Sequence, residues 1–295
     1  MTNHSDIRIG TLIPHDNAAN YIRQVLPHGF ESFQLFIWEK IAAGVDLKKV
    51  APEVLAACGD KAVVSSLGMF GNPMQNEQTL GDWRKCIDNA RAFNCDLVCG
   101  FAGALDDKSV PDSMPRYKEV WSDLVKRAED NGVRIAFENC DMGGTWQAAK
   151  YNIAHAPTAW ELMWDAVPSK AVGIEWEPCH QMGSFVEPIP QLRKLVASGK
   201  LFHVHGKDAT VARDVIREFG TRGGKPWIWH RHPGFGDTNW TDVISILRQH
   251  NYKGFIDIEG WHDPVYKGEL EMTGQVHALN YLKRCRGGAF VPSPK

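Results

Sequence analysis

The chain has 295 residues, of which 43% are hydrophobic and 23% are charged, values that are ordinary for a globular protein with a large core. Its 33 Lys and Arg residues against 35 Asp and Glu residues give a net charge of −2, whereas a domain that holds a nucleic-acid backbone carries a basic excess. The first residues lack the apolar stretch of a signal peptide, and no run is long enough to span a membrane. We therefore expect a cytoplasmic protein that binds neither nucleic acid nor membrane.

The predicted elements alternate between strand and helix along the whole chain. Short apolar or alternating runs predict strands at residues 7–13, 31–37, 62–68, 96–102, 134–138, 172–177, 201–206 and 255–259. Apolar residues that recur three and four positions apart predict helices at residues 18–26, 47–58, 80–93, 115–132, 158–167, 189–199, 240–251 and 270–285.

Eight strand–helix repeats predict an α/β fold, a (β/α)8 TIM barrel formed by residues 1–295 as a single domain. A doubly wound open sheet is the alternative, but it usually has fewer strands and a glycine-rich phosphate turn after the first one, which this sequence lacks. The longest irregular stretch is a loop at about residues 207–239, after the seventh strand. A loop of that length in a compact domain is typical of a lid or a binding loop.

The seven cysteines are scattered and odd in number, and several of them fall in or beside predicted strands or on apolar helix faces. This usage is typical of free thiols in a reducing compartment rather than of a disulfide framework. It supports the expectation of a cytoplasmic protein.

Four predicted strands end at a residue that can bind metal. RIAFENC carries Glu138, GIEWEPCH carries Glu177 and His180, LFHVHGKD carries His205, and FIDIEGWHD carries Glu259. A strand that ends on such a residue brings it to the rim of the barrel, where the active sites of this fold are built. Since consecutive strands are neighbours, we expect these side chains to converge.

Three carboxylates and one imidazole make an oxygen-rich site for a divalent cation. Glu138, Glu177, His205 and Glu259 are the predicted ligands. Such a set suits Mn²⁺, Mg²⁺ or Co²⁺ better than a structural Zn²⁺, which prefers thiolate and imidazole. Glu175 and His203 share the strand parity of Glu177 and His205, but they lie one layer deeper. We expect Glu175 to support the ligands and His203 either to support them or to pack in the core.

The order of these motifs resembles the xylose-isomerase-like barrel superfamily of sugar phosphate isomerases and epimerases. The resemblance covers nearly the whole chain and rests on Glu138, then E-P-x-H, then H-V-H-x-K-D, then I-x-I-E. It implies that the four predicted ligands hold one divalent cation, most often Mn²⁺. It also implies that Glu138 and Glu259 act as an acid/base pair on opposite faces of a sugar.

Two positions depart from the pattern of that superfamily. The second metal ligand is usually Asp, whereas this chain has Glu177. Ketose epimerases tend to carry a further Glu one turn beyond the strand-five ligand, and the segment NCDMGGTW has none. The general mechanism is therefore expected to carry over better than any particular substrate.

Other residues near the strand ends are candidates for catalysis or substrate binding. His180 is placed to bond a substrate hydroxyl or to shuttle a proton, and a rim histidine that caps a turn is the alternative. Lys207 either binds a substrate oxygen or pairs with the neighbouring Asp208. Further candidates for substrate contact, or for ordinary loop surface, are Arg222, Arg231, Trp261 and His262. Tryptophans expected near the mouth, for stacking or for helix packing, are Trp146, Trp176, Trp227, Trp229 and Trp261.

These features predict a divalent-metal-dependent sugar isomerase or epimerase that transfers a proton alpha to a carbonyl. A metal-dependent lyase that acts on 3-keto-glycosides, similar to the C-glycoside deglycosidases, is the alternative, and it would imply a small β-rich partner subunit. A remote alternative is an endonuclease-IV-type DNA repair enzyme, which uses several zinc ions and more histidines. The expected partners are a small carbohydrate substrate and, from the resemblance, further copies of the chain in a homodimer or tetramer.

Overall fold

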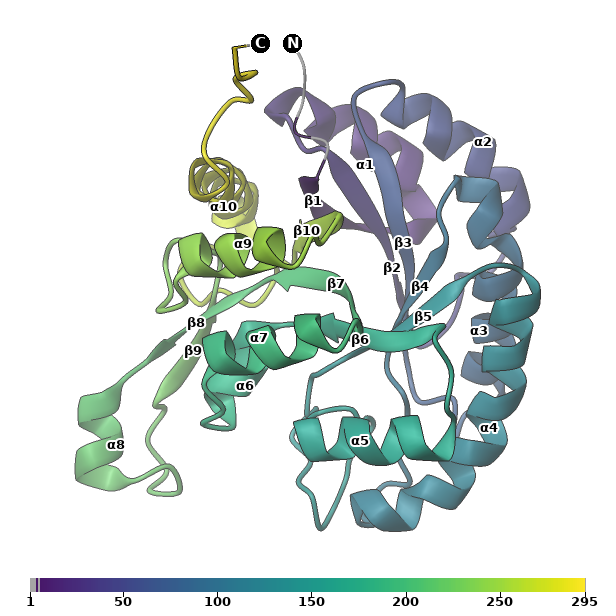
Figure 1. Cartoon of the computed structure of the whole chain (residues 1–295), viewed down its shortest axis with the longest axis vertical. Coiled ribbons are helices and arrows are strands. Elements are labelled where there is room, and N and C mark those ends of the chain that lie inside the picture. Colours follow the sequence, from purple (N-terminus) through teal and green to yellow (C-terminus); the bar gives the residue numbers. More distant parts are fainter. Residues whose placement is uncertain (1–3, 5, 295) are drawn as a thin grey trace.

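Eight parallel strands close into a barrel in the computed structural model, which describes residue 4 and residues 6–294 (Figure 1). Around the barrel the strands follow the order β1-β10-β7-β6-β5-β4-β3-β2, and β1 pairs with both β2 and β10. The strands are β1 (Ile7–Pro14), β2 (Ser32–Trp38), β3 (Val63–Phe70), β4 (Leu97–Gly100), β5 (Arg134–Glu138), β6 (Val172–Trp176), β7 (Leu201–Gly206) and β10 (Gly254–Ile258). The predicted (β/α)8 TIM barrel is confirmed.

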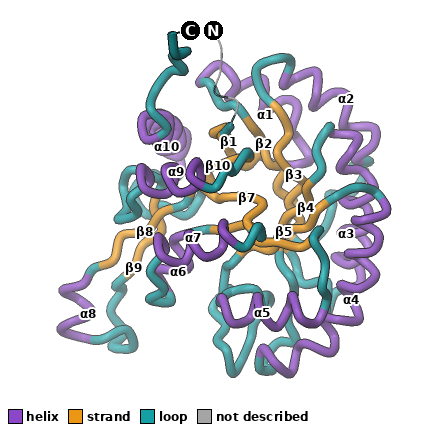
Figure 2. The backbone as a smooth tube through the Cα atoms, viewed as in Figure 1, coloured by secondary structure: helices purple, strands orange, loops and turns teal. Residues whose placement is uncertain are grey.

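Helices form the outer layer around the barrel (Figures 1 and 2). They are α1 (Ala18–Val25), α2 (Leu47–Cys58), α3 (Glu77–Asn89), α4 (Val110–Asp130), α5 (Pro157–Ala166), α6 (Pro178–Gly183), α7 (Pro188–Ala197), α8 (Arg213–Phe219), α9 (Trp240–Gln249) and α10 (Glu271–Cys285). Short 3-10 turns are η1 (His15–Asn17), η2 (Leu26–His28), η3 (Ala90–Phe93) and η4 (Gly268–Leu270). None of the described helices has the length and apolar character of a membrane span.

Helix α4 illustrates how the sequence specifies the outer layer. Ser109 caps its N-terminus by accepting a hydrogen bond from the backbone N–H of Asp112 (3.2 Å), and Asp112 also places a negative charge in the first turn. The buried side chains recur three and four positions apart: Val110, Ser113, Tyr117, Val120, Trp121, Leu124, Val125 and Ala128. This stripe packs the helix against the barrel.

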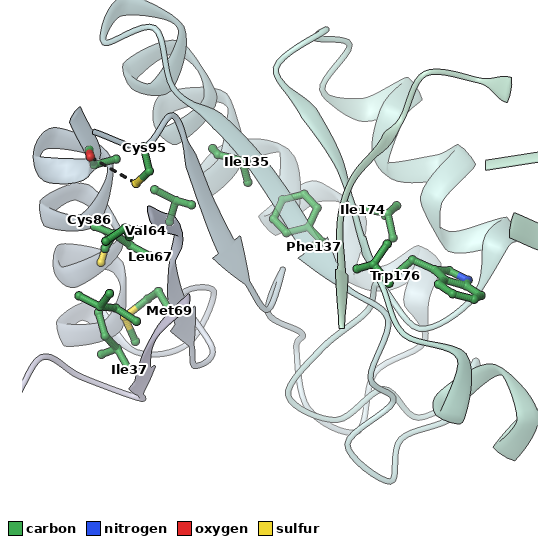
Figure 3. Packing of buried hydrophobic residues seen from close by; sticks show 14 of the residues in the cluster. Ile37, Val64, Leu67, Met69, Cys86, Cys95, Ile135, Phe137, Ile174 and Trp176 are labelled. Atoms are coloured by element: carbon green, nitrogen blue, oxygen red, sulfur yellow. Dashed lines mark hydrogen bonds between the residues drawn. The ribbon is translucent and has the colours of Figure 1, made fainter. Parts of the chain in front are cut away.

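The main hydrophobic core lies between the strands and the helices. Outward side chains such as Leu67 and Met69 of β3 pack with Cys86 of α3, while Phe137 of β5 and Trp176 of β6 occupy another part of the same cluster (Figure 3). All seven cysteines are free thiols, as expected, and six of them are buried. The apolar runs in the strands therefore form the layer outside the barrel wall.

The interior of the barrel is polar rather than filled by branched apolar side chains. The buried residues that point inward include Gln34, Ser65, Ser66, Glu175, His203, His205 and Asp257. Gly10 of β1 makes room for one of them, because a Cβ at this position would collide with Asp257 and Ser32. This hydrogen-bonded interior lies directly beneath the rim residues.

An ion pair closes the barrel at the amino ends of β1 and β2. Both terminal nitrogens of Arg286, which follows α10, lie within 2.9 Å of the Glu31 carboxylate, and one of them donates to the carbonyl of Ile7 at 2.7 Å. Glu31 also accepts a hydrogen bond from the N–H of Ile9. The pair ties the last helix to the first two strands, and both labelled chain ends lie at this end of the barrel (Figure 1).

The segment that the sequence predicts as a long irregular loop contains two strands and a helix, so that part of the prediction is wrong. Residues 208–231 form an arm in which β8 (Asp208–Val211) pairs antiparallel with β9 (Ile228–Arg231). The ribbon extends away from the barrel and carries α8 between its strands (Figure 2). Backbone pairing across the arm could not be read from a sequence rich in Gly, Pro and Trp.

Candidate functional site

The four predicted ligand residues come together at the carboxyl end of the barrel. Glu138 is the last residue of β5, Glu177 directly follows β6, His205 lies near the end of β7, and Glu259 directly follows β10. These strands are neighbours in the barrel. One ligand atom from each of the four side chains lies within 4.8 Å of the others. The geometry thus forms the cluster that the strand ends predict.

The two oxygens of each carboxylate face different groups. The Oε2 atoms point toward Nδ1 of His205, at 3.0 Å from Glu177, 3.3 Å from Glu259 and 3.9 Å from Glu138. The Oε1 atoms face donors of the protein. Lys207 Nζ lies 3.0 Å from Oε1 of Glu177 and 3.1 Å from Oε1 of Glu259. Three Oε2 atoms and one imidazole nitrogen therefore converge, while Lys207 contacts the opposite oxygens of Glu177 and Glu259.

Two histidines also lie beside the Oε1 atoms of the three carboxylates. His180 Nε2 lies 3.1 Å from Oε1 of Glu177 and 3.6 Å from Oε1 of Glu138. His262 Nε2 lies 2.9 Å from Oε1 of Glu259. Both histidines line the cavity in front of the carboxylates.

Deeper in the barrel a chain of contacts fixes the ring of His205. Its Nε2 lies 3.0 Å from Oε1 of Glu175 and 2.8 Å from Oε1 of Gln34. Glu175 also faces Nδ1 of His203 at 2.9 Å, and Nε2 of His203 lies 2.9 Å from Asp257. The predicted supporting role of Glu175 and His203 fits these contacts.

Reciprocal amide contacts hold the rim segments. The side chain of Asn139 donates to the carbonyl of Glu177 at 2.9 Å and accepts from its N–H at 2.7 Å. The side chain of Asn152 donates to the carbonyl of Glu138 at 2.9 Å. Because these bonds fix the backbone at two ligand positions, the carboxylates are positioned before any ligand arrives.

The acidic cluster shifts the pKa values of its members in opposite directions. Burial, together with the nearby charges of Glu177 and Glu259, raises the pKa of Glu138 well above its usual range. Burial also acts to raise the pKa of Glu177, but Lys207 and His180 outweigh it and hold that pKa well below its usual range. The repulsion among the crowded carboxylates can thus be offset either by a proton on Glu138 or by a bound cation.

The cavity in front of the cluster has a volume of about 720 Å³. Its lining includes Lys207, Trp261 and His262, which are among the predicted substrate-binding residues. Lys207 faces the ligand carboxylates rather than its neighbour Asp208. Asp208 instead accepts hydrogen bonds from the Trp240 indole and from the N–H of Thr238.

The structure places other predicted contact residues away from the cavity lining. Nε of Arg231 donates to Asp263 at 2.9 Å, and Arg222 is exposed in the arm. Trp176, expected near the mouth, is fully buried in the outer core, where its indole donates to Gln181 at 2.7 Å (Figure 3). The mouth prediction is wrong for Trp176 because its side chain points outward from β6, opposite to Glu175 and Glu177.

Sequence reasoning missed an aromatic surface that lines one side of the cavity. It comprises Phe36, Trp38, Phe70, Phe101 and Trp261, of which only Trp261 is predicted. Phe36 and Phe70 lie at inward positions near the carboxyl ends of β2 and β3, and Phe101 directly follows β4. Phe36 and Phe70 continue the apolar runs of their strands, so the rule that finds the metal-ligand candidates by an interruption of such a run does not find them.

Comparisons with known proteins agree with this fold. A sequence profile of the family described as xylose isomerase-like TIM barrel matches residues 22–285. No curated protein sequence matches the chain.

Solved structures of several enzymes share the fold at low sequence identity. A 3-keto-D-glucoside 4-epimerase from E. coli superposes with a TM-score of 0.70 at 16% identity, over 95% of this chain and 100% of that one. An L-ribulose 3-epimerase superposes with a TM-score of 0.69 at 12% identity, over 95% of each chain. Mannonate dehydratase from Streptococcus suis serotype 2 superposes with a TM-score of 0.72 at 12% identity, over 96% of this chain and 94% of that one.

Proposed function

The chain belongs to the xylose isomerase-like TIM barrel family, and we propose that it is a divalent-metal-dependent isomerase or epimerase of a sugar or sugar derivative. The observation that carries the proposal is the set of three Oε2 atoms and one Nδ1 atom gathered at the rim of the barrel. The epimerase names of two structural neighbours support the same class of reaction.

The residues at the rim fit a divalent cation. Glu138 and Glu177 are buried and the side chain of Glu259 is only 10% exposed, so their closeness is electrostatically costly unless positive charge compensates them. Nε2 of His205 is hydrogen-bonded to Oε1 of Gln34 at 2.8 Å and lies 3.0 Å from Glu175, which leaves Nδ1 free to act as a ligand. Carboxylate oxygens with one imidazole favour Mn²⁺, with Mg²⁺ or Co²⁺ as alternatives. When bound, such a cation acts as a Lewis acid that polarises a carbonyl and makes the adjacent C–H more acidic.

The residues of the chain would then position the sugar and move its proton. Glu138 and Glu259 come from β5 and β10, on either side of β6 and β7, so a sugar between them has a carboxylate on each side. One carboxylate removes the proton from the carbon next to the carbonyl, and the other returns a proton. His180 is placed to bond a hydroxyl group, and Lys207 adds positive charge beside the same carboxylates.

A lyase reaction is the second candidate. It would begin with the same removal of a proton and end with loss of the group on the next carbon. One feature that favours it is the segment NCDMGGTW after Glu138, which lacks the further Glu that ketose epimerases tend to carry one turn beyond this ligand. The likeness to a mannonate dehydratase, whose name describes an elimination, adds support. In that case a small β-rich partner subunit is also proposed.

Proton exchange observed by NMR tests the proposal. The Mn²⁺-loaded protein is incubated in D₂O with free ketoses, phosphorylated sugars and 3-keto-glycosides, and its metal content is measured. We expect one cation per chain and deuterium at the carbon next to a carbonyl. Glu259→Gln should abolish the exchange, whereas Glu269→Gln, which changes an exposed carboxylate in η4, should not.

The outcomes separate the candidate functions. A rearranged sugar establishes the isomerase or epimerase, and a released aglycone establishes the lyase. Absence of exchange with every substrate, in a protein shown to bind one cation, would contradict the proton-transfer proposal. Three bound zinc ions would contradict it as well.

A further inference from the structure

One side of the cavity is built from more aromatic surface than a sugar ring needs. The aromatic wall, defined as Phe36, Trp38, Phe70, Phe101 and Trp261, comes from β2, β3 and the segments after β4 and β10. Its rings form a continuous surface. The centroids of Phe36 and Phe70 are 5.2 Å apart, those of Phe70 and Phe101 are 5.4 Å apart, and those of Phe36 and Trp261 are 5.8 Å apart.

The wall remains open to solvent at the mouth of the cavity. Trp38 is 46% exposed and Trp261 is 43% exposed, which places two of the largest apolar side chains at the entrance. Trp38 stacks on Tyr151 with ring centroids 6.0 Å apart and planes 8° apart. Exposed aromatic surface of this extent inside a cavity marks a binding surface for an apolar group.

The backbone beside the wall is held in an unfavourable conformation. Trp261 has φ 68° and Tyr151 has φ 65°, values that are uncommon for bulky residues. Side chains hold both of them, since the N–H of Trp261 donates to Glu271 at 3.0 Å and the hydroxyl of Tyr151 donates to Glu39. Backbone strain of this kind is found where a binding site holds its residues in position before the ligand binds. Here it fixes the rings of Trp261 and Tyr151.

The polar part of the cavity would hold the sugar. Glu138, His180, Lys207, Glu259 and His262 line it and offer donors and acceptors to hydroxyl groups. Hydroxyl groups placed against the aromatic wall would lose their bonds to water and gain no partner. The volume of about 720 Å³ lies within the range that accommodates drug-sized ligands, which leaves room for a second group beside the sugar.

We propose that the substrate is a keto sugar derivative that carries an aromatic substituent, with the sugar at the acidic cluster and the aromatic substituent on the aromatic wall. The inference rests on the proposed function for the position of the sugar. The stacked pair of Trp227 and Phe185, with ring centroids 5.3 Å apart, places a further aromatic residue of the lining, Trp227, in the cavity. A planar group of one or two rings matches this surface better than a phosphate, for which the wall supplies no cation.

Calorimetric binding of methyl, phenyl and 2-naphthyl β-glycosides of glucose, galactose and xylose tests this inference. Burial of one aromatic ring predicts that a phenyl glycoside binds roughly tenfold more tightly than the methyl glycoside of the same sugar. The naphthyl glycoside should bind more tightly still. Trp261→Ala and Trp38→Ala should each reduce the ratio of phenyl to methyl affinity. Phe290→Ala, which removes an exposed ring packed on His4, should leave the ratio unchanged.

Equal affinity for methyl and aryl glycosides would overturn the inference, and so would failure of all of them to bind a protein that takes up its metal normally. The readout is separate from the proton-exchange experiment. Aryl preference without proton exchange would support the aromatic subsite and contradict the proposed reaction. Proton exchange on free sugars without aryl preference would support the reaction and contradict the subsite.

Discussion

Nε2 of His205 lies 3.0 Å from Oε1 of Glu175, and both side chains are fully buried. Because this contact uses one ring nitrogen, the other nitrogen is directed at the three carboxylates of the rim. A negative charge behind the ring also makes its free nitrogen more basic, which strengthens it as a ligand. A residue outside the ligand cluster is therefore expected to influence how tightly metal binds.

Glu175→Gln tests this relationship. The amide has nearly the same shape but no charge, so we expect the affinity for Mn²⁺ to fall by about 10- to 100-fold. Calorimetric titration of the metal-free protein with Mn²⁺ measures the change. Glu161→Gln, on the exposed face of α5, is the matched control and should bind Mn²⁺ as the wild type does. Unchanged affinity for Mn²⁺ in Glu175→Gln would show that the charge of Glu175 does not strengthen His205 as a ligand.

Lys207→Met is expected to move metal binding and catalysis in opposite directions. Lys207 brings a positive charge within 3.1 Å of Glu177 and Glu259. Its removal should raise the affinity for Mn²⁺ about tenfold, because a competing cation is lost. The rate of proton exchange should fall at least about tenfold, because developing negative charge on the substrate loses a stabilising partner. Lys194→Met in α7 is exposed and serves as the control in both assays.

Trp121 anchors the segment that carries Phe101 into the cavity. Its indole N–H donates to the carbonyl of Ala102 at 2.7 Å, and its ring packs edge-on against Phe137 with centroids 4.5 Å apart. Trp121→Phe should lower the free energy of unfolding by about 1 kcal/mol, chiefly through the lost hydrogen bond. Trp121→Ala should lower it by about 3–5 kcal/mol, because a cavity is left in the core. Denaturant unfolding measures both values. Equal losses of unfolding free energy in the two variants would contradict the separate contributions of the hydrogen bond and of ring packing.

The ion pair between Glu31 and Arg286 predicts a pH-dependent stability. Burial acts to raise the pKa of Glu31, but the hydrogen bonds and charge of Arg286 outweigh it and lower the pKa below its ordinary value of 4.5. The stabilisation is therefore complete above pH 4.5 and is lost as the pH falls through the lower pKa of the folded state.

Glu31→Gln checks this sign. At pH 7 the variant should be less stable than the wild type by about 3 kcal/mol, because Arg286 loses a partner in a largely buried pair. The difference should shrink when unfolding is measured below pH 4.5, where the wild-type carboxylate also begins to take up a proton. A difference that stays constant down to pH 3 would show that the charge of Glu31 is not the cause.

The strands could be predicted from the sequence because each one carries a short apolar run that faces the outer core. The predicted strand bounds differ from the structure by two residues or fewer, and the segment at 134–138 agrees fully. Helix α4 begins before Pro115, where the prediction starts it, because Ser109 caps the helix and Pro115 is tolerated inside it. Helix α6, six residues long, follows Glu177 and was too short to give a periodic signal.

The candidate metal ligands were predictable for a different reason. A charged or imidazole side chain directly after an apolar run interrupts the pattern, and Glu138, Glu177, His205 and Glu259 all do so. The aromatic wall gave no such interruption, since Phe36 and Phe70 continue the apolar runs that they end. Whether an aromatic residue faces the cavity or the helices depends on strand parity and on a register shift between Phe33 and Gln34, which only the structure reveals.

The cavity is lined by residues from two parts of the chain, the arm and the barrel. It contributes Trp227, Ile228 and His230 to the lining, whereas the four clustered ligand candidates all come from the barrel strands or the residues that follow them. Helix α8, which joins the strands of the arm, has no buried residue. The part of the arm beyond the buried residues Asp208 and Ala209 can therefore change in sequence and length without disturbing the barrel. Selection or design could exchange it to alter which molecules are admitted, while the proton chemistry stays with the barrel.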